Sequence, residues 1–113
     1  MSISEEIIGD IVIETINSNR ATLIESENLK KLIYDKVEKG YKKIIIDLSN
    51  AEFIDSTFLG VIVNGLKKVV SLGGDLKLVG FKPAVRSMFE LTRLFRVFES
   101  YPELQSALKS FQK

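Results

Sequence analysis

Cysteine and histidine are both absent from this chain. The absence of cysteine excludes disulfides and thiolate chemistry, and without either residue the usual zinc ligands are missing. A catalytic triad of serine, histidine and an acid is excluded as well, because no histidine can act as the base. The sequence therefore favours a non-enzymatic protein, and we predict no catalytic residue, metal or cofactor.

Long apolar runs and strong charge are also missing. No apolar run approaches the length of a membrane span, and the N-terminal MSISEEIIGD lacks the basic and apolar regions of a signal peptide. The net charge is +1, and the basic residues form no block. We therefore predict a soluble cytoplasmic protein with no membrane insertion and no nucleic-acid binding.

The 113 residues, of which 45% are apolar, suit a single domain spanning 1–113. β-branched residues over 3–8 and 11–16 predict two strands joined by a tight turn. A helix is predicted over 26–39 by the helical spacing of Leu29, Leu32, Ile33 and Val37.

The second half alternates between strands and helices. The β-branched run 44–46 predicts a strand buried on both faces, as in a parallel sheet covered by helices. The spacing then predicts a helix over 56–72, a strand over 75–80, a short helix opening at Pro83, a short strand over 96–100, and a last helix capped by Ser100 and Glu103. Alternation after a hairpin predicts an α/β fold with a mixed β-sheet of four to five strands and helices packed against it.

An acid and two hydroxyls stand at the junction between the central strand and the following helix, in FIDSTFLG. Asp55, Ser56 or Thr57 can accept hydrogen bonds from the free N–H groups of the first helical turn. One interpretation is a purely structural helix cap. The other is a hydroxyl that another protein modifies.

Residues from Ile44 to the C-terminus resemble a bacterial anti-sigma factor antagonist of the STAS family. The resemblance rests on Asp47-Leu48, on Asp55-Ser56-Thr57-Phe58-Leu59-Gly60, on Gly73-Gly74 and on Pro83. It implies a single STAS-like domain. It also implies that an anti-sigma factor with Ser/Thr kinase activity phosphorylates Ser56, with Thr57 as the alternative acceptor. The unphosphorylated protein then binds that kinase and releases a sigma factor.

The expected partner surface surrounds this serine and follows the exposed side of the helix. It comprises Asp55, Ser56, Thr57, Phe58, Val61, Asn64 and Lys67. The alternative interpretation of the last three is a solvated helix face. The oligomeric state stays open between a monomer and a weak dimer.

Two positions depart from the family pattern. Phe58 stands where the family has glycine, so its ring either reshapes the docking surface or packs inward. The stretch 19–22 replaces the family's Gly-x-(Leu/Ile)-Asp before the first helix. An alternative function is a non-switching STAS subunit of a larger assembly, such as a stressosome-like complex or a partner of a lipid-transport ATPase.

Other polar residues give weaker signals. Asp47, Asp55 and Asp75 could suggest a metal site like that of receiver domains, but the acidic pair that follows the first strand of such domains is missing. Arg93 and Arg96 could meet a phosphate, although exposure to solvent is their more ordinary role.

Overall fold

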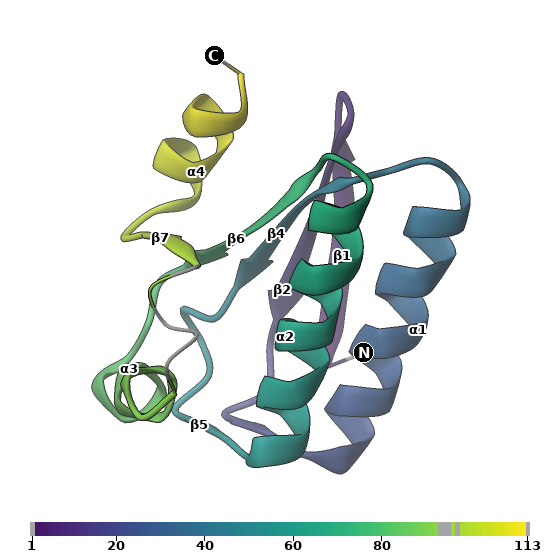
Figure 1. Ribbon diagram of the computed structural model, residues 1–113. Coiled ribbons are helices and arrows are strands. Elements are labelled where there is room, and N and C mark those ends of the chain that lie inside the picture. The colour runs from purple at the N-terminus through teal and green to yellow at the C-terminus, as the bar shows by residue number, and fades with distance from the viewer. Residues whose placement is uncertain (1, 93–95, 97, 113) are drawn as a thin grey trace.

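A five-stranded mixed sheet forms the centre of the molecule, as the computed structural model of residues 2–92, 96 and 98–112 shows (Figure 1). The strand order is β1-β2-β4-β6-β7; β1 runs antiparallel to β2, and the other neighbours are parallel. The expected α/β class with a mixed sheet is confirmed. The strands are β1 (Ile3–Ile8), β2 (Ile11–Ile16), β4 (Lys43–Asp47), β6 (Asp75–Val79) and β7 (Glu99–Tyr101).

Helices cover both faces of this sheet. The helices are α1 (Leu23–Glu38), α2 (Ser56–Ser71), α3 (Pro83–Glu90) and α4 (Leu104–Phe111). The first three contribute to one core with Ile44 and Ile46, and α4 packs on the other face against Ile45. All three isoleucines are fully buried, which confirms the prediction of a strand covered on both sides.

A second, two-stranded parallel sheet joins the starts of α1 and α2. It pairs β3 (Arg20–Ala21) with β5 (Phe53–Ile54), and the Asp55 amide donates to the Ala21 carbonyl at 3.2 Å. The two helices therefore begin at the same end of the molecule and lie side by side (Figure 1). The β3 segment falls within the stretch that departs from the family pattern.

Some predicted boundaries are wrong. The first helix begins at Leu23 instead of residue 26, because the Thr22 amide is already capped by the Glu25 carboxylate at 3.0 Å. Ser100 pairs with Leu78 in the sheet and is not a helix cap. Helix α4 follows Glu103, which makes no side-chain capping hydrogen bond.

Helices α1 and α2 approach closely where Gly65 lies. A Cβ at Gly65 would be 3.2 Å from Ile33 Cδ1 and 3.3 Å from Leu76 Cδ1, which is tighter than ordinary van der Waals contact, so a larger residue would require these side chains to shift. The glycine therefore permits close packing of α2 against both α1 and β6.

An ionisable cluster lies beneath α1. Glu5 and Glu14 are direct neighbours across β1 and β2, and buried Lys36 of α1 lies 2.7 Å from Glu5 Oε1. Burial, together with the neighbouring Glu5, raises the pKa of Glu14 to about 9. Burial opposes ionisation of Glu5 too, but hydrogen bonds from Glu14 and Lys36 outweigh it and lower the Glu5 pKa. We therefore expect Glu14 to be protonated at neutral pH, with its proton available to the neighbouring Glu5.

Because the folded state holds this proton, the free energy of unfolding should decrease as the pH becomes alkaline. The folded state keeps the Glu14 proton up to about pH 9, whereas the unfolded chain loses it near its ordinary value, so stability falls as pH rises between these limits. We expect Glu14→Gln to flatten this fall and to be more stable than the unmodified sequence at pH 8, by an amount on the order of 1–4 kcal/mol. Urea unfolding from pH 6 to pH 9 measures both slopes. Parallel curves for the two proteins would contradict the assignment.

Candidate functional site

Asp55 is the cap of α2. Its Oδ1 accepts a hydrogen bond from the Phe58 amide at 2.9 Å, and its own carbonyl accepts from the Leu59 amide at 3.0 Å. Asp55 has extended backbone angles, so the chain passes directly from β5 into the first turn of α2 at this residue. The carboxylate therefore has a structural role as the helix cap, and the Ser56 and Thr57 hydroxyls are not needed for capping.

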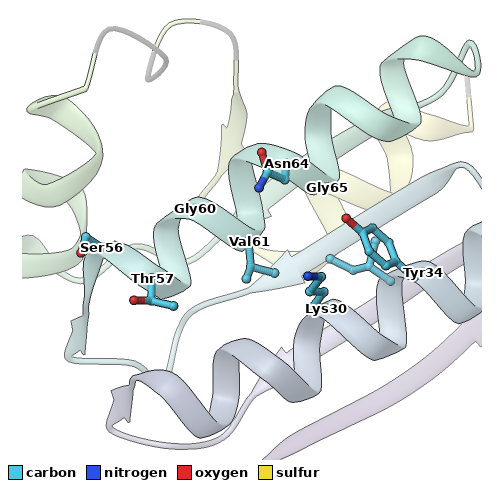
Figure 2. Close-up of a pocket in the computed structure, with 9 residues that line it drawn as sticks. Lys30, Tyr34, Ser56, Thr57, Gly60, Val61, Asn64 and Gly65 are labelled. Atoms are coloured by element: carbon cyan, nitrogen blue, oxygen red, sulfur yellow. The ribbon is translucent and has the colours of Figure 1, made fainter.

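Ser56 and Thr57 are the first two residues of α2, and both are exposed. Consecutive helical side chains point about 100° apart, so the two hydroxyls face different directions. Figure 2 shows Ser56 at the very start of the helix and Thr57 on the side that faces α1. Both oxygens stand on a rigid support that is fixed by the Asp55 cap and the β3–β5 pairing.

The expected contribution of Phe58 to the partner surface requires correction. Its side chain is fully buried and belongs to the core between the sheet and the first three helices. Of the two alternatives, inward packing is the one that the structure shows. Phe58 is the third residue of α2, and the helical rotation directs its side chain toward the sheet while Ser56 and Thr57 face solvent. The buried ring therefore packs beneath the helical turn that carries the two exposed hydroxyls.

A groove runs between α1 and α2 beside these hydroxyls. Near the start of α2 it encloses about 250 Å³ and is lined by Lys30, Ile33, Tyr34, Ser56, Thr57, Gly60, Val61, Asn64 and Gly65. Figure 2 shows Lys30 and Tyr34 projecting from α1 toward the side of α2 that carries Val61. The predicted residues Val61 and Asn64 therefore come together with Ser56 and Thr57, whereas Lys67 is exposed further along α2 and does not line this part of the groove.

Sequence reasoning missed the wall of the groove that α1 supplies. Lys30 and Tyr34 are four residues apart, and each directly follows a buried residue of α1, Leu29 or Ile33. Both side chains are exposed and lie next to the buried side of the helix. The same spacing that predicted the apolar side of the helix places them together on one face. What the spacing could not show is that this face lies beside α2.

The three aspartates do not gather into a metal site. Each accepts a local backbone hydrogen bond: Asp47 from the Ser49 amide at 2.9 Å, Asp55 from Phe58, and Asp75 from the Leu76 amide at 2.8 Å. Within residues 2–92, 96 and 98–112, no group of three acids, cysteines or histidines could hold a metal ion. Arg96 is exposed, and Arg93 lies outside the described residues.

The family model of the STAS domain matches residues 3–107, which is nearly the whole chain. The chain belongs to the STAS-domain family. The whole five-stranded sheet and the capped α2, with Asp55-Ser56 at its start, lie within the matched residues. In the described part of the chain, no helix has both the length and the apolar character needed to cross a membrane.

Similar proteins cover the STAS domain over its full length. The TM1081 homolog of Thermotoga neapolitana, named as a candidate anti-sigma factor antagonist, is 40% identical over 109 residues, 95% of each chain. The crystal structure of TM1081 from Thermotoga maritima has a TM-score of 0.88 at 34% identity and covers 98% of this chain and 95% of that chain. The phosphorylated form of SpoIIAA from Bacillus has a TM-score of 0.78 at 16% identity, covering 96% and 98%, which shows a shared fold.

Proposed function

We propose that this STAS domain is a cytoplasmic anti-sigma factor antagonist, and that phosphorylation of Ser56 by an anti-sigma factor kinase prevents the two proteins from binding. The observation that carries the proposal is the exposed Ser56 hydroxyl at the capped start of α2. The relatives from Thermotoga, which are named as candidate anti-sigma factor antagonists, support the same function.

Access and rigidity make Ser56 a suitable kinase substrate. A kinase must hold the acceptor hydroxyl in line with the γ-phosphoryl group of ATP. The Ser56 oxygen then forms the new P–O bond, ADP leaves, and the hydroxyl proton passes to a base of the kinase. The Asp55 cap and the buried Phe58 ring keep the acceptor in one position on the surface, so little ordering is needed when the kinase binds.

The added phosphate changes the surface more than the fold. A phosphoserine carries about −1.5 to −2 charges at neutral pH, and a helix N-terminus tolerates such a charge well. In the complex, the same dianion would lie beside the Asp55 carboxylate and would need to be desolvated. Loss of affinity without unfolding is therefore the expected consequence. The proposed partner surface comprises Asp55, Ser56, Thr57, Val61, Asn64 and Lys67, of which Asp55 and Val61 are half-buried and the others exposed.

Phosphorylation of Ser56 can be tested with purified anti-sigma factor kinases from the source organism. We expect one of them, with ATP and Mg²⁺, to add a single phosphate that mass spectrometry places on Ser56. Ser56→Ala should abolish the modification, and Thr57→Ala should leave it in place. Phosphate that maps to Thr57 would transfer the switch to the neighbouring hydroxyl, and phosphate elsewhere, or none with any kinase, would contradict the proposal.

A further inference from the structure

The groove between α1 and α2 extends well beyond the acceptor hydroxyls. Past the part that Thr57 and Val61 line, a second hollow is lined by Tyr34, Val37, Glu38, Lys68 and Leu72. Tyr34 lines both hollows, so they lie next to each other along the two helices. We refer to the two together as the helical groove, from Ser56 and Thr57 at its open end to Leu72 at its far end.

Lys30 supplies the charge of the first part of the helical groove. It is the only charged residue among those that line this part. In the described part of the chain, no carboxylate lies within 4.0 Å of its ammonium group, which instead stands 5.8 Å from the centre of the Tyr34 ring. Asp35, on the same helix, is already paired with Lys36 and Lys39. The Lys30 charge is therefore available to an incoming anion.

On the side that faces α2, Lys30 lies beside Tyr34 and Val61, whereas on the outer side of α1 it borders a charged hollow that Glu27, Lys31, Asp35 and Glu38 also line. Tyr34 is 43% exposed, and Leu72 in the adjacent hollow is 45% exposed, although both side chains are large and apolar enough to be expected inside. Val61 forms part of the opposite wall (Figure 2). A segment that complements this groove needs a carboxylate for Lys30 and, next to it, an apolar side chain for Tyr34 and Val61.

We propose that the helical groove receives a segment of the anti-sigma factor in which a carboxylate pairs with Lys30 and an adjacent apolar side chain packs on Tyr34 and Val61. This inference rests on the proposed function, because it names the chemistry of the same partner. It also gives the switch a second cause: a phosphate at the open end of the groove repels the carboxylate that Lys30 attracts.

Charge reversal at Lys30 tests the proposal. The probe is the anti-sigma factor kinase that phosphorylates Ser56 in the experiment above, titrated calorimetrically with the unmodified chain in the absence of ATP. We expect Lys30→Glu to weaken binding by about tenfold or more, with a smaller dependence on salt, and Tyr34→Ala to weaken it as well. The matched control is Lys109→Glu, an exposed lysine on α4 at the other face of the sheet, which should bind within about twofold of the unmodified chain.

The outcomes separate this inference from the proposed function. Equal affinity of Lys30→Glu and the Lys109→Glu control, while Ser56→Glu still binds about tenfold or more weakly, would overturn the groove and leave the switch intact. If no anti-sigma factor binds the unmodified chain, both proposals are wrong. A change of self-association in Lys30→Glu, seen by sedimentation without a change in kinase affinity, would assign the groove to a second copy of this chain and overturn the inference. Recovery of binding by Lys30→Glu when a carboxylate of the kinase is changed to lysine would identify the pair directly.

Discussion

Replacing Phe58 with alanine is expected to lower the free energy of unfolding by about 3–5 kcal/mol. The ring is fully buried in the first turn of α2, within the core that the sheet shares with α1, α2 and α3. Its removal loses the transfer free energy of an aromatic side chain and leaves a cavity that the rigid strand-to-helix junction cannot fill. For a domain whose total stability is about 5–15 kcal/mol, this is a large fraction. Urea unfolding monitored by circular dichroism measures it.

Leu91→Ala is the matched control for this change. Leu91 is also a large apolar residue close to a helix end, but it is 84% exposed, so its truncation should change the stability by less than about 0.5 kcal/mol. Phe58→Gly, which introduces the residue typical of the family, should destabilise at least as much as alanine, because glycine also costs about 1 kcal/mol within a helix. A Phe58→Ala protein as stable as the Leu91→Ala protein would mean that the ring does not support the acceptor site.

Replacing Ser56 with glutamate is expected to weaken binding to the anti-sigma factor kinase by about tenfold or more, and phosphorylation by about a hundredfold. Glutamate brings one negative charge to the start of α2, whereas the phosphate brings nearly two and is bulkier. Both stand beside the Asp55 carboxylate, which the helix cap holds in place. Because a helix N-terminus favours an anion, the variant should fold normally, and its stability should not fall.

Gln105→Glu serves as the control for an added charge. Gln105 is exposed on α4, on the other face of the sheet, and its replacement changes the net charge by the same amount as Ser56→Glu. Isothermal titration of both variants separates a local effect at the α2 start from a general effect of net charge. Equal weakening in the two variants would show that the position of the charge is unimportant.

Local patterns predicted the strands and helices well wherever one residue type dominates a face. The run 44–46 is β-branched throughout, and only a strand covered by helices on both sides buries all three positions. The hairpin over 3–16 followed from β-branched residues on either side of Gly9, whose φ of 62° allows the tight turn. The family motif led to the prediction that Ser56 is the phosphate acceptor, and the structure places its side chain at an exposed position.

Long-range pairing explains what the sequence could not show. Lys36 occupies a position on the buried side of α1, where local reasoning expects an apolar residue, and it is tolerated there because Glu5 of β1 neutralises it. Ser100 looks like a helix cap until β7 pairs it with Leu78 of β6. The helical groove likewise arises from long-range packing: Gly65 permits close packing of α2 against Ile33 of α1, and the groove between the two helices brings Lys30 and Tyr34 beside the hydroxyls of Ser56 and Thr57.

The most direct measurement compares two forms of one protein: the chain phosphorylated on Ser56 alone and the same chain after phosphatase treatment. Each is titrated with the anti-sigma factor kinase in the absence of ATP, and circular dichroism checks that both are folded. The account predicts that the phosphate reduces the affinity about a hundredfold and that its removal restores it. Equal affinity of the two folded forms would contradict the claim that the charge on Ser56 controls binding.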